Sequence, residues 1–545
     1  MPAAQFDFIV IGAGSAGCAL VYQLVRNPAH RVLLVEAGSS HHELFVTMPM
    51  GFPMLHDNPR TDWMYRQERP SNRRAETSTW KAGRLLGGGS SINGMVYVRG
   101  QPEDYDDWAR LGNPGWGWRD VLPVFRAIED HQLGADALRG AGGPLPVTCT
   151  AEPNPLSDAW IEAGNRLGLP RRDDLNGEDQ VGIGYYPRTI FRGRRQSAAV
   201  AFLDRVIDRP NLTVMKNAEV RRIVIEDHRA VGVECVTRSG VHNFRATREL
   251  ILSAGAIGSP RLLQHSGIGP AAHLRTLGIE VVRDLPGVGA NLQEHFMSGC
   301  VHTVRHGSLN AEVRGLRLVK NLTEWLLFHR GVMAMAAAQA GAFFKTQPDL
   351  ARADAQLLMA PLCMAGKSDP ATPSVSAPSE RVVPASVGGF TAFGCPTRPS
   401  SRGSVLIRSP DFMIKPCIRY EHLRSEKDQA AIIAIIRFVR ELAAQPALAA
   451  YGPTEVLPGP AVRTDEALLD HALNTGQLGY HPAGTCRMGG DAMAVVDHRL
   501  RVAGIHGLRV ADASIMPVIT SGNTNAPAMM IGFKAGAMIA AEHGC

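Results

Sequence analysis

The sequence predicts an α/β fold in which a Rossmann-like dinucleotide-binding domain carries an inserted α+β domain. The first observation is a strand, a glycine-rich turn, a helix and a second strand within the first 36 residues. The second is that short apolar strands return over 212–253 and near the C-terminus, whereas 299–470 follows another pattern. At roughly 100–200 residues per domain, a chain of 545 residues has room for both parts.

The N-terminal segment is predicted to form a βαβ unit. Residues 8–11 are a short apolar run, typical of a strand that is buried on both faces of a parallel sheet. Residues 15–26 place apolar side chains at helical spacing, and residues 31–35 form a second apolar strand that ends at Glu36.

The remaining elements are less regular. Residues 83–118 are predicted to be mainly loop, because repeated Gly and Pro interrupt both regular periods. Strands are expected over 212–214, 220–225, 231–235 and 249–253, helices over 260–265, 322–328, 428–443 and 527–541, and a Pro- and Ser-rich linker over 367–384. The predicted dinucleotide-binding domain comprises 1–155, 196–300 and 471–545, and the inserted substrate-binding domain comprises 156–195 and 301–470.

Composition narrows the functional class. The 57 basic and 51 acidic residues give a net charge of +6, too weak and too scattered for a nucleic-acid-binding face. The densest basic run, Arg192 to Arg195, is either a solvated loop or a contact for an anionic substrate or cofactor. The nine Cys residues form no C-x-x-C pair, so we expect neither a disulfide framework nor a metal site, and a reducing cytoplasm fits best.

The sequence shows no sign of export or of a membrane span. The N-terminus lacks a basic segment followed by an apolar stretch, so no signal peptide is predicted. The longest apolar stretch, residues 332–344, is too short to cross a bilayer. We therefore expect a cytoplasmic protein whose contact with a membrane, including the inner membrane, is at most peripheral.

The turn after the first strand has the pattern of a dinucleotide-binding motif. Gly12 would form the tight turn, Gly14 would let a pyrophosphate approach the backbone, and Gly17 would allow close packing of helix and strand. Ser15 and Ala16 begin the helix, whose free N–H groups attract an anion. Glu36 is positioned to accept hydrogen bonds from an adenosine ribose. The motif alone does not distinguish NAD from FAD.

Several later motifs resemble the glucose–methanol–choline (GMC) oxidoreductase family. Gly83-Arg84-Leu85-Leu86-Gly87-Gly88-Gly89-Ser90-Ser91-Ile92-Asn93-Gly94 is similar to its first signature, and Ser253-Ala254-Gly255-Ala256-Ile257-Gly258-Ser259-Pro260 to its second. Tyr480-His481-Pro482-Ala483-Gly484-Thr485 resembles its catalytic block, and residues 508–514 and 523–525 complete the set. The resemblance implies FAD as the cofactor, the GMC architecture and, in most members, oxidation of an alcohol.

The resemblance also implies which residues contact FAD. They surround the adenosine, the pyrophosphate and the flavin ring: Glu36, Ala37, Arg84, Leu86, Gly89, Ser90, Asn93, Gly94, Met95, Val96, Val220, Asp512, Ala513, Asn523 and Thr524. Asn523 is placed near the pyrimidine edge of the ring. Some members attach FAD covalently through a His where this chain has Ile92, so non-covalent FAD is predicted.

Two residues are predicted to be catalytic. His481 is the candidate base, because its ordinary pKa of about 6.5 suits removal of a hydroxyl proton as hydride leaves. By resemblance, Asn525 occupies the second catalytic position, where its amide would hydrogen-bond the alcohol oxygen. The structural alternatives are a hydrogen-bonded core His and a turn-forming Asn.

The substrate and the electron acceptor stay open between several alternatives. A primary alcohol is the first expectation and a polyol the second; choline ranks lower because Gln339 stands where choline-type members often carry an acidic residue. The acceptor is unknown: a quinone or a redox protein is favoured over oxygen, which would make the protein an alcohol oxidase. A hydroxynitrile lyase of the same fold and a non-catalytic nucleotide-binding module are the readings from other classes.

Overall fold

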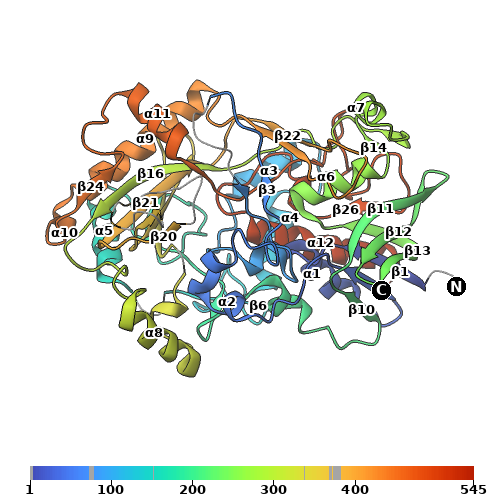
Figure 1. Cartoon of the computed structure of the whole chain (residues 1–545), viewed down its shortest axis with the longest axis horizontal. Helices are drawn as coiled ribbons and strands as arrows, with labels where there is room; N and C mark the ends of the chain where they lie inside the picture. The colour runs from blue at the N-terminus through green and yellow to red at the C-terminus, as the bar shows by residue number, and fades with distance from the viewer. Residues whose placement is uncertain are drawn as a thin grey trace.

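The protein is described by a computed structural model that covers residues 4–72, 79–150, 153–336, 338–366, 371, 373 and 382–544. Two large sheets lie along the long axis of the molecule, with helices packed around and between them (Figure 1). The first sheet, at the right of Figure 1, has the order β10-β2-β1-β13-β12-β11, and β26 also pairs with β13. The second sheet, at the left, has the order β24-β16-β21-β18-β17-β7, and β25 also pairs with β16.

The parallel part of the first sheet contains the predicted βαβ unit, which the structure confirms. It consists of β1(Ala4–Ile11), α1(Ser15–Leu24) and β2(Val32–Val35). The four strands β10, β2, β1 and β13 run parallel, and β26 joins β13 in the same direction. The carboxyl ends of β1 and β2 therefore meet at one edge of the sheet, where ligands bind in such folds. Its other strands are β10(Leu212–Met215), β11(Glu219–Glu226), β12(Arg229–Thr237), β13(Gly240–Leu252) and β26(Leu508–Val510).

Strand β13 is longer than predicted, for a reason visible in its burial. Its first ten residues are exposed or half-buried, and Gly240 to Arg245 pair with β12 as an antiparallel ribbon. Only its last three residues are fully buried between neighbours, and this is the apolar run that the sequence reveals. A ribbon that faces solvent has no apolar run, so hydrophobicity alone misses its start.

The C-terminal helix α12(Asn525–Glu542) packs directly on α1. A side chain at Gly532 would come 2.0 Å from the Ala16 carbonyl oxygen, so the two backbones cross in contact. Helices from the first and last parts of the chain thus share a single hydrophobic core, which includes Leu20 and Met529.

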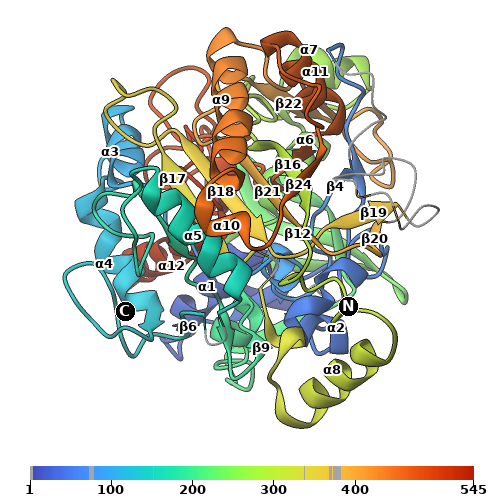
Figure 2. The ribbon, with the colours of Figure 1, turned by 90° about the vertical axis from the view of Figure 1, so that its left-hand side faces the viewer.

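The second sheet is antiparallel throughout and forms its own core. Its strands are β7(Gly182–Tyr185), β16(Phe296–Thr303), β17(Ala340–Phe344), β18(Ala355–Ala360), β21(Gly389–Pro396), β24(Thr454–Leu457) and β25(Gln477–Leu478). Helices α5(Pro155–Arg166), α9(Glu426–Ala443) and α11(Asp465–Thr475) contribute to its core, and Figure 2 shows α9 and α5 in front of the strands. The helix predicted over 428–443 is therefore present. The division into domains stays a prediction.

The sequence interpretation missed two helical segments. Residues 83–118 are mostly loop, as predicted, but they also contain α3(Pro102–Arg110), whose Gln101 and Asp104 form a capping box and whose Tyr105 and Trp108 are buried. The small-residue turn after Ser253 is already helical, because α6(Gly255–His265) begins there and tolerates Pro260 in its first turns. Short buried helices with few apolar residues give weak periodic signals, which explains both errors.

The remaining elements are short or peripheral. The helices are α2(Leu44–Thr47), α4(Trp118–Ile128), α7(Ala271–Thr276), α8(Gly315–Phe328) and α10(Pro446–Ala449), and the short 3₁₀ helices include η2(Gly88–Ser91) and η4(Val332–Ala334). Two-stranded pairs are β3(Tyr65–Arg66)/β4(Thr79–Trp80), β5(Glu129–His131)/β6(Leu145–Val147), β8(Ile190–Phe191)/β9(Arg194–Arg195), β14(Ile268–Gly269)/β15(Arg283–Asp284), β19(Met364–Gly366)/β20(Val382–Pro384) and β22(Gly403–Leu406)/β23(Cys417–Tyr420). Most of the predicted linker over 367–384 lies outside the described residues, and its end forms β20. Among the described helices, none is both long and apolar enough to cross a bilayer.

Candidate active site

The turn between β1 and α1 has the geometry of a phosphate-binding loop. Gly12 has a φ of +98°, and a side chain there would come 2.5 Å from the Ser253 carbonyl oxygen. A side chain at Gly17 would come 2.0 Å from the Gly12 carbonyl oxygen, so α1 packs against the turn itself. Gly14 differs, because its nearest neighbour would be 3.9 Å away and the space beside it is open. Helix α1 starts at Ser15 without a side-chain cap, which leaves its first N–H groups available to an anion.

Glu36 is held rigidly beside this turn. Its carboxylate accepts hydrogen bonds from the backbone N–H groups of Ala13 at 2.9 Å and Gly38 at 2.8 Å. Burial raises the pKa of Glu36 to about 7, against the lowering effect of these two donors. The N–H of Ala218 donates to the Glu36 carbonyl at 2.9 Å, which brings Val220 of β11 to the same edge.

A second glycine-rich segment folds onto the first. The N–H of Gly87 donates to the Ala13 carbonyl at 2.7 Å, and a side chain at Gly88 would come 2.7 Å from the Gly14 Cα. Gly89 has nothing within 4 Å of where a side chain would start. Open space therefore lies beside each of the two positions Gly14 and Gly89.

The first of several residues that sequence reasoning missed is Arg195, which is buried rather than solvated. Its guanidinium donates to the carbonyl oxygens of Val46, Ser90 and Asn93 and to Asn93 Oδ1. Burial lowers the pKa of Arg195 to about 9. Arg195 thus fixes the segment that includes Ser90 and Asn93, while Arg192 and Arg194 are exposed as a solvated loop requires.

Other predicted cofactor residues lie around the same space. Ser90 Oγ accepts the N–H of Ala198 at 2.9 Å, and the N–H of Leu86 donates to the Ser39 carbonyl at 3.0 Å. Met95, next to Gly94, is buried with a φ of +63°, and Val96 bridges to Arg188. The partly exposed guanidinium of Arg84 lies 5.0 Å from the ring centroid of Trp63 and 3.8 Å from Glu219, and its charge opposes the rise in the pKa of Glu36.

Asp512 is tied to the start of α6 instead of offering a free carboxylate. Its carboxylate accepts hydrogen bonds from Gly255 N at 2.9 Å, Ser259 Oγ at 2.6 Å and Ser514 N at 2.8 Å. The carbonyl of the next residue, Ala513, accepts the N–H of Gly484 at 3.2 Å. The end of β26 is therefore connected to the loop that carries His481.

His481 lies at the centre of a buried polar cluster. Its backbone N–H donates to both carboxylate oxygens of Glu294, at 2.8 and 2.9 Å. Its ring nitrogens contact His295 Nδ1 and Asn523 Nδ2, each at 3.0 Å. A side chain at Gly479 would come 2.9 Å from His481 Nδ1, so only a glycine at this position avoids a clash with the imidazole.

The partners of the two imidazoles determine their protonation. His295 Nε2 lies 2.9 Å from the Thr397 carbonyl oxygen, which can only accept, so this nitrogen carries the hydrogen. Burial lowers the pKa of His295 to about 4, so the ring is neutral and its Nδ1 is an acceptor. His481 must then donate from Nδ1, which leaves a lone pair on its Nε2. Burial, and secondarily His295, hold the pKa of His481 well below its ordinary value.

The asparagine beside His481 is Asn523 and not Asn525. Asn523 Nδ2 donates to His481 Nε2, and its Oδ1 accepts from Gln356 Nε2 at 3.0 Å. Asn525 is the first residue of α12, and its Oδ1 accepts from Ser15 Oγ at 2.7 Å. The predicted pairing of His481 with Asn525 is therefore wrong. Asn523 and Asn525 are separated only by Thr524, but they stand on opposite sides of the helix start, so their side chains reach different partners, His481 and Ser15.

His295, Glu294 and Gln356 were also missed from the sequence. All three are fully buried, and they position His481 or Asn523. A usable signal exists only for the first two: a pair of ionisable residues stands directly before the wholly apolar start of β16. Burial of unpaired ionisable side chains is costly, so such a pair marks a functional or structural demand.

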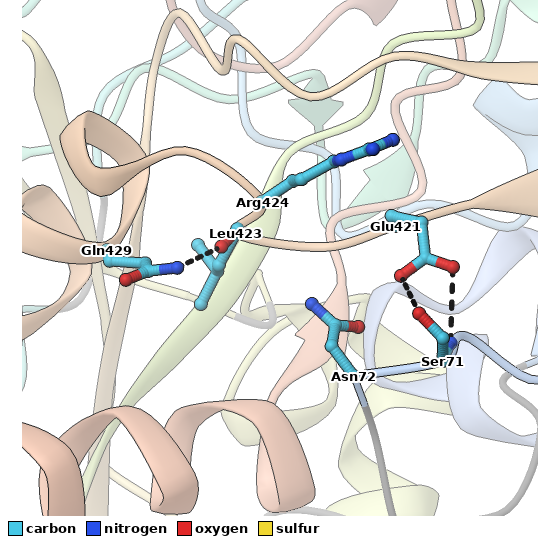
Figure 3. Close-up of a pocket in the computed structure, with 6 residues that line it drawn as sticks. All are labelled: Ser71, Asn72, Glu421, Leu423, Arg424 and Gln429. Atoms are coloured by element: carbon cyan, nitrogen blue, oxygen red, sulfur yellow. Dashed lines mark hydrogen bonds between the residues drawn. The ribbon is translucent and has the colours of Figure 1, made fainter.

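A surface hollow elsewhere is not a competing site. It is lined by Ser71, Asn72, Glu421, Leu423, Arg424 and Gln429 (Figure 3). Ser71 donates from its N–H and its hydroxyl to Glu421, and Gln429 donates to the Leu423 carbonyl at 3.0 Å. Ser71, Glu421, Leu423 and Gln429 are thus hydrogen-bonded within the hollow, and none of the His481 cluster lines it.

The fold, the glycine-rich turn beside Glu36 and the buried imidazole pair of His295 and His481 together define the class of the protein, which is a flavin-dependent oxidoreductase. The chain belongs to the GMC oxidoreductase family, whose N-terminal model matches residues 6–297 and whose C-terminal model matches residues 399–532. Its cofactor is FAD, and it acts on the CH–OH group of its donor. The open space beside Gly14 and Gly89, the uncapped start of α1 and the carboxylate of Glu36 fit that cofactor.

Known relatives agree with this assignment. The chain is 40% identical over 540 residues to an oxygen-dependent choline dehydrogenase of Brucella suis, covering 97% of this chain and 95% of that protein. It is also 40% identical over 535 residues to an oxygen-dependent choline dehydrogenase of Rhizobium etli, with the same coverage. Among solved structures, pyridoxine 4-oxidase from Mesorbium loti is 32% identical with a TM-score of 0.87, covering 99% of this chain and 100% of that one. A formate oxidase is 26% identical with a TM-score of 0.91, covering 100% and 99%.

We expect FAD to be released when the purified protein is precipitated with acid. The position where some family members carry the attaching His is Ile92, whose side chain packs with Val46, Leu55 and Leu85 and cannot form the bond. The measurement is the flavin absorbance of supernatant and pellet after acid treatment. Yellow colour that stays with the precipitated protein would contradict non-covalent binding.

Proposed function

We propose that the protein oxidises a small primary alcohol to the aldehyde, with His481 as the base that removes the hydroxyl proton. The observation that carries this is the arrangement of His295, His481 and Asn523, which presents a lone pair and an amide N–H side by side. The identity of 40% to choline dehydrogenases supports the reaction class, since choline is itself a primary alcohol.

The site would use its own residues to activate the alcohol. FAD, when bound, supplies the hydride acceptor. An alcohol whose oxygen lies beside both His481 Nε2 and Asn523 Nδ2 would replace the 3.0 Å hydrogen bond between them, donate its hydroxyl hydrogen to the imidazole and accept from the amide. The amide then stabilises negative charge on the oxygen as the proton leaves. Because the site is buried, both interactions act with little screening by water.

Asn523 is expected to matter for the reaction and Asn525 for the structure. Asn523→Ala should slow alcohol-dependent flavin reduction by about 10²-fold, the cost of removing one donor to a developing oxyanion. Asn525→Ala is the matched control, because it removes the same amide two residues away and should keep a reduction rate within a factor of about three. Both are measured by anaerobic stopped-flow absorbance. Equal losses in the two variants would remove Asn523 from its proposed role.

His295 is expected to act as a positioning residue that fixes the tautomer of His481. His295→Leu removes the acceptor for His481 Nδ1 and should slow flavin reduction more than about tenfold, because a base held in the wrong tautomer is ineffective. His295→Gln restores one acceptor and one donor and should recover most of the rate. A purely structural role predicts instead that both variants lose thermal stability together and that Gln gives no preferential recovery of rate.

An anaerobic panel of alcohols tests the proposed function. Choline, benzyl alcohol, pyridoxine, 1-butanol and sorbitol would be added to the holoenzyme, and bleaching of the flavin would be followed. Bleaching by a primary alcohol supports the proposal. Flavin that stays oxidised with every alcohol contradicts it and favours the hydroxynitrile lyase alternative, which would then be tested by release of cyanide.

Choline is the second candidate, because the relatives named above are choline dehydrogenases. Gln339, where a carboxylate would attract the cation, is buried; its Oε1 accepts from Ser157 Oγ at 3.1 Å. A neutral amide gives no charge attraction, so we rank neutral primary alcohols first. The ratio of kcat/KM for choline to that for 1-butanol decides between them.

The electron acceptor is proposed to be a quinone or a redox protein, with oxygen as the alternative. The names of the relatives, oxygen-dependent dehydrogenase and oxidase, favour the alternative. Repeating the alcohol assay in air with detection of peroxide separates the two. Hydrogen peroxide formed in equal amount to the aldehyde would assign oxygen as the acceptor.

A further inference from the structure

Helix α8 has apolar side chains on its outer face. Leu316, Val319, Leu326 and Leu327 recur at helical spacing and are 88%, 59%, 53% and 66% exposed. A helix on the surface of a globular protein normally turns its polar face to solvent. Phe328, at the end of the helix, is also exposed, at 61%.

The opposite face of α8 is already packed against the protein. Trp325 is buried with Met48 and Met333, and its Nε1 donates to the Gly193 carbonyl at 2.8 Å. Leu318 and Leu322 pack against the same cluster. The outer leucines are therefore not needed to hold the helix, and their exposure requires another explanation.

Neighbouring segments extend the apolar area. The contact of Trp325 with Gly193 brings the hairpin of β8 and β9 to the end of α8, where Phe191 is 41% exposed. Figures 1 and 2 both show α8 at the edge of the molecule with α2 alongside, and α2 exposes Leu44 and Phe45. The term α8 surface is used below for these outward apolar side chains: Phe191, Leu316, Val319, Leu326, Leu327 and Phe328.

The charges around the α8 surface are mostly positive. Residues 191–194 and 312–330 contain six exposed cations and only two carboxylates. The cations are Arg192, Arg194, Arg314, Arg317, Lys320 and Arg330, and the carboxylates are Glu312 and Glu324. Both carboxylates are engaged, Glu312 with Arg317 at 2.7 Å and Glu324 with Arg330 at 3.0 Å. Within the described residues the other four cations have no ion pair with a carboxylate. Arg192 lies 5.1 Å from the ring centroid of Phe191.

We propose that the α8 surface docks the protein on an anionic phospholipid bilayer. Leucine and phenylalanine side chains would enter the interface between headgroups and acyl chains, while the arginines and Lys320 would contact the negatively charged headgroups. A second copy of the chain fits less well, because a two-fold contact would oppose two surfaces of the same positive charge. The basic run at 192–194, which the reaction does not use, thereby acquires a role.

The test is sedimentation of the full-length holoenzyme with phospholipid vesicles. We expect the protein to pellet with vesicles that contain phosphatidylglycerol, to pellet less with pure phosphatidylcholine, and to be released by high salt. Leu326→Ser combined with Leu327→Ser should weaken binding more than about tenfold. Arg192→Gln combined with Arg194→Gln should weaken it by a similar factor, and only on anionic vesicles.

Controls keep the test independent of folding and of the reaction. Leu111→Ser changes a leucine of similar exposure, 51%, beyond the end of α3, and should bind vesicles as the unmodified protein does. All variants should keep their flavin content and their rate of flavin reduction. Failure of the unmodified protein to bind anionic vesicles, or binding by both double variants that is as tight as that of the unmodified protein, would overturn the proposal. A dimer in solution that Leu326→Ser with Leu327→Ser converts to a monomer would also overturn it, and would assign the surface to a second copy.

Discussion

Replacement of His481 by Ala should lower the rate constant of alcohol-dependent flavin reduction by about 10²–10⁴-fold, the usual contribution of a positioned base. The physical reason is that hydride leaves the alcohol carbon readily only when the attached oxygen carries negative charge. His481 Nε2 is the atom that would accept the hydroxyl proton. His481→Ala should nevertheless bind FAD normally, since its own contacts are with Glu294, His295 and Asn523. The measurement is anaerobic stopped-flow absorbance of the oxidised flavin, with the ratio of FAD to protein determined first.

A matched control is His273→Ala. The imidazole of His273 also contacts a backbone carbonyl, that of Ile407 at 2.8 Å, but it lies outside the His481 cluster. This variant should reduce its flavin at the unmodified rate. A His481→Ala protein that contains FAD and is reduced at a rate close to the unmodified one would remove His481 from the mechanism.

The pH dependence of the same step follows from the lowered pKa of His481. The neutral imidazole is the active form, and burial favours it over the charged form. The rate should therefore stay constant as the pH falls through about 6.5, the ordinary value for His, and decrease only at lower pH. A rate that is already half-lost at pH 6.5 would contradict a buried neutral base.

Substitution of Gly17 by Ala should prevent FAD from binding because it disturbs the fold. The added methyl group would come 2.0 Å from the Gly12 carbonyl oxygen, so α1 must move away from the end of β1. Such overpacking should cost about 1–3 kcal/mol of unfolding free energy. We expect a lower midpoint of thermal unfolding for the apoprotein and little or no flavin in the purified protein.

Gly14→Ala is the informative counterpart. Its methyl group would meet the Ser253 carbonyl oxygen at 3.9 Å, an ordinary contact, so the apoprotein should unfold at the unmodified temperature. The same group would enter the open space beside Gly14, where the pyrophosphate is expected, and should weaken FAD binding more than about tenfold. Binding is measured by quenching of flavin fluorescence. If Gly14→Ala binds FAD as tightly as the unmodified protein, the pyrophosphate lies elsewhere.

Local sequence patterns determined the cofactor half of the protein. The strand, turn and helix from Ala4 to Leu24 could be predicted because each part has a signal within a few residues: an apolar run, three spaced glycines and a helical repeat. Glu36 followed from its place at the end of the next strand. The amphipathic helix near 428–443 was likewise found from its periodicity, and a final helix over 527–541 was expected as well.

The polar cluster around His481 was decided by tertiary structure alone. His295 lies 186 positions away from His481 in the chain, and Gln356 lies 167 positions from Asn523, so no local pattern links them. The choice between Asn523 and Asn525 depended on which one precedes the first turn of α12, and helix ends are poorly fixed by sequence. Arg195 was misjudged because a buried arginine and an exposed one look identical in a basic run, and only the carbonyl groups that surround it in the folded chain separate them.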